Sequence, residues 1–341
     1  MTADAASART SPPTLHDVAR TAGVSLATAS RVLNGSERKV AESFRERVEK
    51  AAEELGYTAN ASAQATARGT SAAIALLVAD IADPYFGLIA SGVARGADEE
   101  GLIVTIAITE RDPQRETKIL RALRGQRPRG VILAASRGND GEDDTHGELA
   151  AFSGLGGRTV TFGPGGDRSI RIDNRGGAER LGRAMAALGY RRAIAIGATE
   201  GVRTSDDRLA GFTAGFGAEG GVIERTYRGT FERESGDASM RQALADGVDP
   251  GTLVFALSDV IAIGAMTAIR EGGRRVGADI AVCGFDDVPV SRDVTPRLST
   301  VRVPLIELGY QAFRATVDDE WHPPTADLDV IVRESTPGVD R

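Results

Sequence analysis

Cysteine, histidine and long apolar runs are scarce in this chain of 341 residues. Cys283 is the single cysteine, so an internal disulfide and a multi-thiolate metal site are excluded. The three histidines show no metal-ligand spacing, and we expect no bound metal. No apolar run approaches the ~20 residues of a membrane span. The N-terminal stretch MTADAASARTSPP lacks the apolar core of a signal peptide, so we expect a cytoplasmic protein with a disordered tail over residues 1–13.

Motifs for enzymatic chemistry are missing as well. The chain has no Walker A sequence, no GxSxG nucleophile elbow and no SxxK pair, and no histidine or cysteine adjoins a candidate nucleophile. GFGAEG at residues 215–220 matches GxGxxG, but it ends a helical pattern, whereas a dinucleotide site follows a strand and opens a helix. We predict that the protein is not an enzyme and holds no cofactor.

Charge is distributed unevenly along the chain. The whole protein carries a net charge of −7, whereas residues 1–69 contain nine Lys/Arg against eight Asp/Glu. This first segment is therefore not strongly basic. If it binds nucleic acid, helix N-termini and a few arginines must supply many of the phosphate contacts.

Residues 14–35, TLHDVARTAGVSLATASRVLNG, predict two short helices joined by a tight turn. Thr14 and Asp17 have the spacing of a capping box, Gly23 can take the positive φ of a helix exit, and Ser25 is a good N-cap. A third helix is predicted from about residue 41. Its apolar positions are Phe44, Val48, Ala51, Ala52 and Leu55.

The second of these helices has a small, polar outer face formed by Ala27, Ser30, Arg31 and Asn34. An ordinary helical hairpin would have the same outline. This face, however, fits the major groove of DNA, where a helix-turn-helix places its recognition helix. We predict a DNA-binding headpiece over residues 14–57, followed by a linker or partner-induced helix over residues 58–71.

From residue 72 onward, short apolar runs of strand length alternate with amphipathic helices, which predicts mostly parallel sheets covered by helices. A break near SIRIDNRGG divides this region into two doubly wound lobes. The predicted fold is thus a small all-α headpiece joined to an α/β effector domain over residues 72–341. The predicted strands are AAIALLVA, LIVTIAI, GVILAA, RTVTF, RAIAIG, GTLVFAL, DIAVCGF and LDVIVRES.

Polar side chains follow several of the predicted strands. In open parallel sheets, ligands bind outside the carboxyl ends of the strands. Carboxylates, an arginine and aromatic rings at that edge suit a small ligand rich in hydroxyl groups. Any one of these residues could belong to a surface turn or a helix cap, but their recurrence favours a shared cleft. The residues are Asp80, Asp83, Tyr85, Phe86, Arg208, Ser258, Asp259, Asp286 and Asp287.

Taken in order, these motifs resemble the LacI/GalR family of transcriptional regulators from Thr14 to about Ser335. TLHDVARTAGVSLATASRVLNG is similar to the family's helix-turn-helix almost throughout, and SFRERVEKAAEELGYTAN is similar to its third helix and the start of its hinge. The resemblance implies a headpiece, a hinge helix and a periplasmic-binding-protein-like effector domain, usually in a homodimer. Further landmarks are DPYF, IDNRGGAERLGRAMAALGYRRAIAIG, DDRLAGF, SDVIAIGAMTAIREGGRRVGADIAVCGFDD and VIVRES.

The resemblance also implies which residues act. Base edges would be contacted by Leu26, Ala27 and Arg31. The residues that would hold phosphates or fix the headpiece are Thr14, Ser25, Thr28, Ser30 and Asn34, and the predicted DNA-binding set is completed by Leu15, Asn60 and Thr66. The effector pocket would be lined by Tyr85, Phe86, Arg208, Ser258 and Asp286, and the predicted effector-binding set is completed by Asp83 and Asp259.

Four positions depart from the family pattern. Ser258 stands where many members have asparagine, which shortens one ligand contact. Gly163 stands where an aspartate is common, which removes a polar anchor. In the hinge, Ala59 replaces the usual proline and Thr66 the usual leucine, which bears on how the hinge enters the minor groove.

We therefore predict a sequence-specific regulator, a repressor, that binds a palindromic DNA operator as a homodimer and is switched by a small-molecule effector. A sugar or sugar derivative is the default effector. A nucleobase or nucleoside is the alternative, because Tyr85 and Phe86 could stack on a purine. Two other classes compete, a cytosolic solute-binding protein and a sugar- or nucleotide-converting enzyme. The headpiece argues against the first, and the missing catalytic constellation argues against the second.

Overall fold

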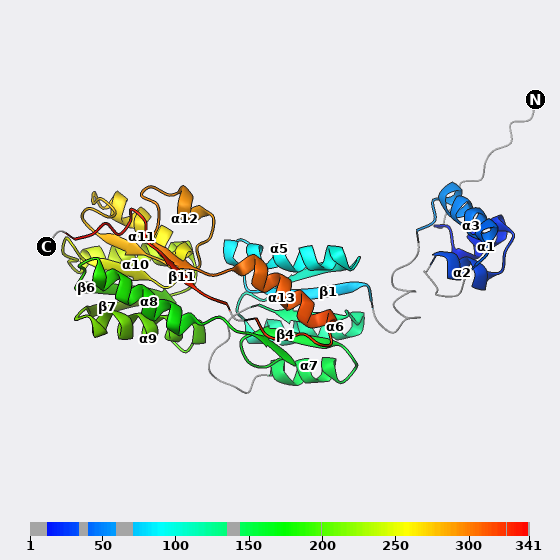
Figure 1. Ribbon diagram of the computed structural model, residues 1–341, viewed down its shortest axis with the longest axis horizontal. Helices are drawn as coiled ribbons and strands as arrows, with labels where there is room; N and C mark the ends of the chain where they lie inside the picture. The colour runs from blue at the N-terminus through cyan, green and yellow to red at the C-terminus, as the bar shows by residue number, and fades with distance from the viewer. Residues whose placement is uncertain are drawn as a thin grey trace, which may run out of the picture. The chain divides into compact units, whose positions relative to one another are not determined.

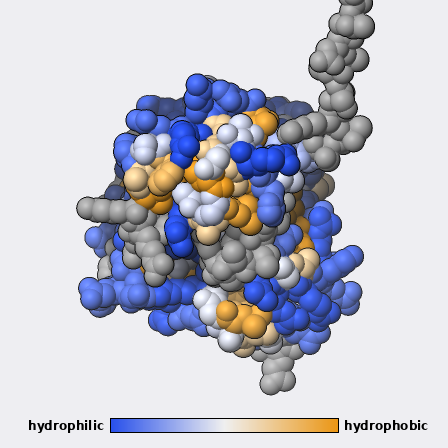
Figure 2. All heavy atoms as spheres, turned by 90° about the vertical axis from the view of Figure 1, so that its right-hand side faces the viewer, coloured by the Kyte–Doolittle hydropathy of each residue, from blue (hydrophilic) through white to orange (hydrophobic). Residues whose placement is uncertain are grey.

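The computed structural model describes residues 12–33, 40–58, 71–134, 144–198, 200–324 and 326–339. The chain divides into two compact units, Met1–Ala72 and Ala73–Arg341 (Figure 1). Among the described residues, no helix is long and apolar enough to cross a lipid bilayer. In the space-filling view, most of the visible surface is hydrophilic, and hydrophobic residues form small patches (Figure 2).

The first unit is a small helical headpiece. Its helices are α1 (Leu15–Ala22), α2 (Leu26–Leu33) and α3 (Glu42–Leu55). The capping box predicted at Thr14 and Asp17 is present, and Gly23 ends α1 with a φ of 64°. The core consists of Val18, Ala19, Ala22, Ala29, Val32, Val48, Ala51 and Ala52. Phe44 was predicted to face this core and does not, because its position on α3 leaves it 41% exposed.

The second unit contains two lobes, each built on a parallel sheet. In the first lobe the strand order is β2-β1-β3-β4-β5. Its strands are β1 (Ala73–Val78), β2 (Ile103–Ile108), β3 (Gly130–Leu133), β4 (Arg158–Phe162) and β5 (Arg168–Ile170), and its helices are α5 (Pro84–Glu99), α6 (Pro113–Gln126), α7 (Asp144–Ser153) and α13 (Leu305–Val317).

Alternate residues of the central strand β1 point to opposite faces of this sheet. Ile74 and Leu76 belong to the same core cluster as α5 and α13, whereas Ala75 and Leu77 pack with α6 and α7. Both faces are therefore covered. That is why β1 is a continuous apolar run in the sequence rather than an alternating one.

In the second lobe the strand order is β7-β6-β8-β9. One face is covered by α8 and α9 and the other by α10 and α11 (Figure 1). The strands are β6 (Arg192–Ala198), β7 (Val222–Gly229), β8 (Leu253–Ala256) and β9 (Ala281–Cys283), and the helices are α8 (Asn174–Ala187), α9 (Arg203–Ala218), α10 (Arg233–Ala245), α11 (Asp259–Glu271) and α12 (Val290–Asp293).

The chain crosses between the lobes more than once. It passes from β5 to α8, then from β10 (Thr300–Arg302) to α13, and it returns from α13 to β11 (Asp329–Ile331), which pairs with β10 (Figure 1). In the first lobe, α13 lies so close to α5 that a Cβ at Gly309 would be 2.1 Å from the carbonyl oxygen of Ile89. These crossings hold the strand ends of the two lobes around a common space.

The eight strands predicted from the sequence are all present, but β5, β7 and β10 were not predicted. β5 and β10 are only three residues long. β7 lies at the edge of its sheet, and its sequence VIERTYRG is rich in charge. Short strands and polar edge strands lack the apolar run on which sequence-based assignment depends.

The GxGxxG match at residues 215–220 has a packing role in this fold. Gly215 lies within α9, and a Cβ there would be only 2.0 Å from the carbonyl oxygen of Glu179 on α8. The glycine thus allows two helices to pack closely. The prediction that this segment ends a helix is confirmed.

Candidate functional site

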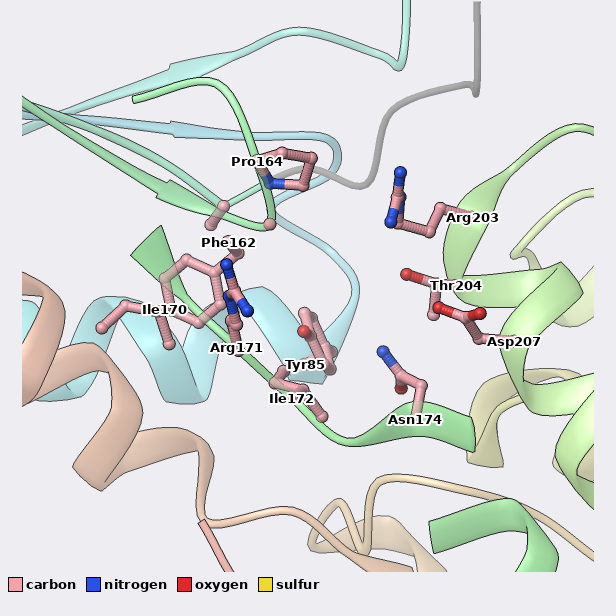
Figure 3. A pocket seen from close by; sticks show the side chains of 12 residues that line it. Tyr85, Phe162, Pro164, Ile170, Arg171, Ile172, Asn174, Arg203, Thr204 and Asp207 are labelled. Atoms are coloured by element: carbon pink, nitrogen blue, oxygen red, sulfur yellow. The ribbon is translucent and has the colours of Figure 1, made fainter. Parts of the chain in front are cut away.

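A cavity of about 330 Å³ lies between the two lobes (Figure 3). This volume falls within the range of small-molecule sites in proteins. It is lined by Tyr85, Ala134, Phe162, Gly163, Pro164, Ile170, Arg171, Ile172, Asn174, Arg203, Thr204 and Asp207.

Both lobes contribute side chains to this cavity. The first turn of α5 supplies Tyr85, and the segment after β5 supplies Arg171. Across the cavity, the first two turns of α9 supply Arg203 and Asp207. In the close-up view, the α9 residues face the aromatic and apolar side chains of the first lobe (Figure 3). The first-lobe wall of the larger cavity is therefore mostly apolar, with Arg171 as its charged residue, and the α9 wall is polar.

A deeper pocket of about 30 Å³ adjoins it and shares Tyr85 and Thr204 with it. The other lining residues of this deep pocket are Asp83, Phe86, Arg111, Arg208, Phe231, Ser258 and Asp286. Five of these seven follow the carboxyl ends of strands β1, β6, β8 and β9 in the chain, as the parallel-sheet rule predicts.

Arg208 and Asp286 form a buried ion pair at the bottom of the deep pocket. Arg208 Nη2 donates to Asp286 Oδ1 at 2.7 Å, and Nη1 donates to the Leu257 carbonyl oxygen at 2.7 Å. The Nε group donates to Asn174 Oδ1 at 2.8 Å, and the guanidinium lies 3.9 Å from the centre of the Phe285 ring. The guanidinium is therefore held in one orientation by its own lobe.

Burial dominates the electrostatics of the deep pocket. It raises the pKa of Asp286 to about 6, although the charge and hydrogen bonds of Arg208 act in the opposite direction. It also raises the pKa of Asp83 and the pKa of the Tyr85 hydroxyl. Tyr85 consequently stays a neutral phenol, able to donate or accept a hydrogen bond.

Arg111 is a pocket residue that was not predicted from the sequence. It follows β2 with a φ of 56°, next to Glu110 at 55°, a backbone region that side chains rarely adopt. Its guanidinium lies 5.9 Å from the ring centre of Phe86 and 5.1 Å from that of Phe231, so it touches both lobes. Burial lowers its pKa. Its position directly after a predicted strand was the signal that could have identified it.

The outer face of α2 is the candidate nucleic-acid interface of the headpiece. Leu26, Ala27 and Arg31 are exposed there, while Thr28 and Ser30 are half-buried. Ser25 accepts a hydrogen bond from the Thr28 backbone N–H at 3.1 Å, so it caps the helix as predicted. This face therefore presents one arginine, one leucine and small side chains to solvent.

Two domain families match the chain in the order that this architecture requires. The helix-turn-helix family described as bacterial regulatory proteins, lacI family, matches residues 14–60. A periplasmic binding protein-like domain matches residues 183–336. The regulator GalR of Escherichia coli is 33% identical over 303 residues, which cover 88% of this chain and 87% of that protein. The chain belongs to the lacI family.

Other lacI-family proteins are similar over almost the whole chain. The regulator CelR of Thermobifida fusca is 32% identical over 90% of this chain and 91% of that protein. The repressor CytR of Escherichia coli is 30% identical over 95% of this chain and 96% of that protein. The relatives are transcriptional regulators, and the prediction of a DNA-binding transcriptional regulator is confirmed.

Solved structures confirm the fold class. A lac repressor dimer bound to operator and an anti-inducer aligns with a TM-score of 0.82 at 25% identity, covering 96% of this chain and 100% of that one. A complex of the regulator CelR with cellobiose aligns with a TM-score of 0.67 at 30% identity, covering 95% of this chain and 99% of that one.

Within this lacI-family fold, most of the predicted effector residues meet in one place. Tyr85, Phe86, Arg208, Ser258 and Asp286 all line the deep pocket, and Asp83 joins them. Asp83 also caps α5 by accepting from the Tyr85 backbone N–H at 2.9 Å, and Ser258 caps α11. The helix-cap and cleft interpretations of these two residues are thus compatible.

The placement of Asp259 differs from the expected one. Its side chain is 0% exposed and does not line either pocket. Its carboxylate accepts from the Val288 backbone N–H at 2.9 Å and from the Thr300 hydroxyl at 2.6 Å. Unlike the other predicted effector residues, Asp259 is therefore not brought into the pocket, and its hydrogen bonds fix the loop after β9.

Asp80 and Asp287 also lie outside the two pockets. Asp80 accepts from the Ala82 backbone N–H at 2.8 Å within a turn. Asp287 is surrounded by Arg292, Arg302 and Arg333. Burial alone would raise the pKa of Asp287, but the hydrogen bonds from these arginines lower it. Both aspartates have structural partners.

In the headpiece, Thr14 is occupied by its capping box, and Leu15 packs on the core as a half-buried side chain. Thr14 is therefore placed to fix the start of α1 rather than to contact bases. Asn34, Asn60 and Thr66, and with them most of the predicted hinge, lie outside the described residues.

Proposed function

We propose that this protein represses transcription by binding a palindromic operator as a homodimer, with α2 of each headpiece in a major groove. The support is the outer face of α2, where Arg31 is exposed beside the small Ala27 and Leu26. Arginine matches the acceptor pair of guanine, and apolar side chains suit a thymine methyl group. The lac repressor structure, an operator-bound dimer, supports the same assembly.

The domain organisation of the proposal follows the two units. Residues 14–57 form the headpiece, residues 58–71 the hinge, and residues 72–341 the effector-binding and dimerisation domain. The Ala-rich hinge is too short to be a stable helix alone in water, so we propose that it folds on DNA. In this scheme the protein acts in the cytoplasm and catalyses no reaction.

The effector binds in the cavity between the lobes, and a sugar or sugar derivative fits it best. The observation that carries this proposal is that one side of the cavity offers hydrogen-bonding groups for hydroxyls and the opposite wall is mostly apolar. The hydrogen-bonding side consists of Asn174, Thr204 and the Arg208–Asp286 pair, and Phe162 belongs to the opposite wall. Sugars offer hydroxyls on their edges and C–H groups on their faces, so both surfaces are used. The related CelR binds cellobiose.

A nucleobase or nucleoside is the second candidate effector. Tyr85 and Phe162 place two aromatic side chains along the larger cavity, where a flat base could stack. Phe86 contributes less than the sequence indicated, because it is buried and packs edge-on against Tyr85 at a centroid distance of 5.0 Å.

Operator selection followed by a gel shift tests the proposal. Purified full-length protein should enrich a palindromic site from random duplex DNA and then be released from it, or bound more tightly, by one compound from a panel of sugars and nucleosides. An enrichment of sites without two-fold symmetry would contradict the dimeric operator. Binding that no panel compound alters would contradict control by these two ligand classes.

A further inference from the structure

Two arginines of the larger cavity have no carboxylate partner among the residues that the structure describes. Arg171 follows β5 in the first lobe, and Arg203 begins α9 in the second. Both side chains are exposed, and neither has an ion-pair or hydrogen-bond partner anywhere in the described part of the chain. Figure 3 shows them on different walls of the cavity.

Two of the three arginines on the neighbouring helix α8 have carboxylate partners. On α8, Arg180 is 3.5 Å from Asp173 and Arg183 is 3.1 Å from Glu179. Arg175 of the same helix is exposed and has no ion pair among the described residues, so what distinguishes Arg171 and Arg203 is that both line one cavity.

The charged side chains balance in the deep pocket but not in the larger cavity. In the deep pocket, Arg111 and Arg208 are matched by Asp83 and Asp286. Among the described residues that line the larger cavity, Asp207 is the single carboxylate against Arg171 and Arg203. Gly163 lines the same cavity with a φ of 111° and adds no side chain. The described lining of the larger cavity therefore carries an excess positive charge, in a chain whose net charge is −7.

The start of α9 adds to this charge. The helix spans 16 residues, and its N-cap Val202 provides no side-chain hydrogen bond to the first turn. The helix dipole makes such an end attractive to anions. Since Arg203 and Thr204 belong to this first turn and line the cavity, the helix end faces the same space as the two arginines.

We propose that the effector carries an anionic group, a phosphate monoester or a carboxylate, held by Arg171 and Arg203 at the start of α9. This inference rests on the proposed function, because it assumes that a small molecule controls the protein from this cavity. The hydroxyl-bearing part of the effector contacts Tyr85, Asn174 and Thr204, and its anionic end binds the guanidinium groups of Arg171 and Arg203. Since one arginine comes from each lobe, the anion also ties the lobes together.

Calorimetric titration of the full-length protein with inorganic phosphate tests the charged subsite directly. Phosphate should bind the wild type, and Arg171→Gln and Arg203→Gln should each weaken binding about tenfold or more, as expected for loss of a charge-assisted hydrogen bond. Arg274→Gln is the matched control, because Arg274 is exposed and lies after α11, at the end of that helix away from the pocket-lining Ser258. Thermal unfolding checks that all three variants fold.

The same titration with three sugars identifies the anion. Glucose 6-phosphate and glucuronate present the two kinds of charge, and glucose presents neither. The proposal is supported if either charged sugar binds more tightly than glucose and this difference in affinity disappears in the Arg171→Gln/Arg203→Gln double variant. Absence of phosphate binding, or equal phosphate binding by the wild type and the double variant, overturns it.

Operator release separates this inference from the function on which it rests. A neutral sugar that releases the wild type and the double variant from operator DNA at the same concentration overturns the anionic effector and leaves the proposed regulator intact. Failure of the protein to bind any operator would contradict the proposed function, whatever the phosphate titration shows.

Discussion

Arg208 and Asp286 face each other at 2.7 Å within the second lobe, with 2% and 5% of their side chains exposed. One comes from α9 and the other from the loop after β9, so the pair connects two segments of one lobe. An effector that reaches the deep pocket therefore meets a preformed ion pair rather than two independent side chains. Removing either partner affects the fold as well as the ligand.

The first prediction concerns this pair. Arg208→Ala or Asp286→Ala should lower the free energy of unfolding by about 3–5 kcal/mol, because each leaves a buried charge without its partner. The double variant should lose less than the sum of the single losses. Urea unfolding measures all three. Arg275→Ala, which breaks an exposed pair with Asp279, should change stability little. A single-variant loss as small as that of this control would contradict the prediction.

The second prediction concerns pH. Burial raises the pKa of Asp286 from 3.8 to about 6 in the folded protein. Between these values the folded state binds a proton that the unfolded chain releases, so the contribution of Asp286 to stability falls as pH rises and is constant above this window. Urea titrations at several pH values should show the wild type losing stability relative to Asp286→Asn across this window. The opposite slope would mean that Arg208 outweighs burial.

The third prediction concerns base reading. Arg31 is the single long basic side chain on the exposed face of α2, and its contact with guanine would be worth ~1–3 kcal/mol of discrimination. Arg31→Ala should therefore weaken operator binding more than binding to random DNA, as measured by fluorescence anisotropy. Lys50→Ala, on the exposed side of α3, serves as a control that keeps operator preference. Equal losses on both DNAs for Arg31→Ala would assign Arg31 to phosphate contact.

The fourth prediction concerns helix packing in the second lobe. Gly215→Ala should destabilise the protein by about 1–3 kcal/mol, because the new methyl group would meet the Glu179 carbonyl oxygen of α8. Gly217→Ala is a control in the same helix with no atom within 4 Å of the added Cβ. It should be neutral or stabilising by up to about 1 kcal/mol through helix propensity. Equal effects in thermal unfolding would argue against close helix contact as the reason for this glycine.

The fifth prediction concerns the hinge. Thr66 offers less apolar volume than the leucine implied by the family resemblance, so we expect a shallow kink at the operator centre. Thr66→Leu should increase DNA bending, most strongly where the centre is a flexible pyrimidine–purine step. Circularly permuted operator fragments measure the bend angle. A wild-type bend already as large as that of Thr66→Leu would show that another residue supplies the wedge.

Much of the architecture could be read from the chain itself. The capping box at Thr14 and the exit at Gly23 are local features that depend on a few neighbouring residues, and both occur as predicted. The apolar strand runs are local as well, because a strand covered on both faces must be apolar throughout. The gathering of Tyr85, Arg208 and Asp286 followed from one topological rule, that the carboxyl ends of parallel strands share an edge.

Tertiary structure decided what each polar side chain does at that edge. Asp259 and Asp286 both follow strands. Asp259 accepts hydrogen bonds from Val288 and Thr300, whereas Asp286 lines the pocket. Arg111 also follows a predicted strand, but the left-handed backbone that brings its side chain into the pocket could not be predicted from the sequence. Strand-end position brings a residue to the cleft, but the direction of its side chain depends on hydrogen-bond partners from distant segments, and only the folded chain brings those partners within reach.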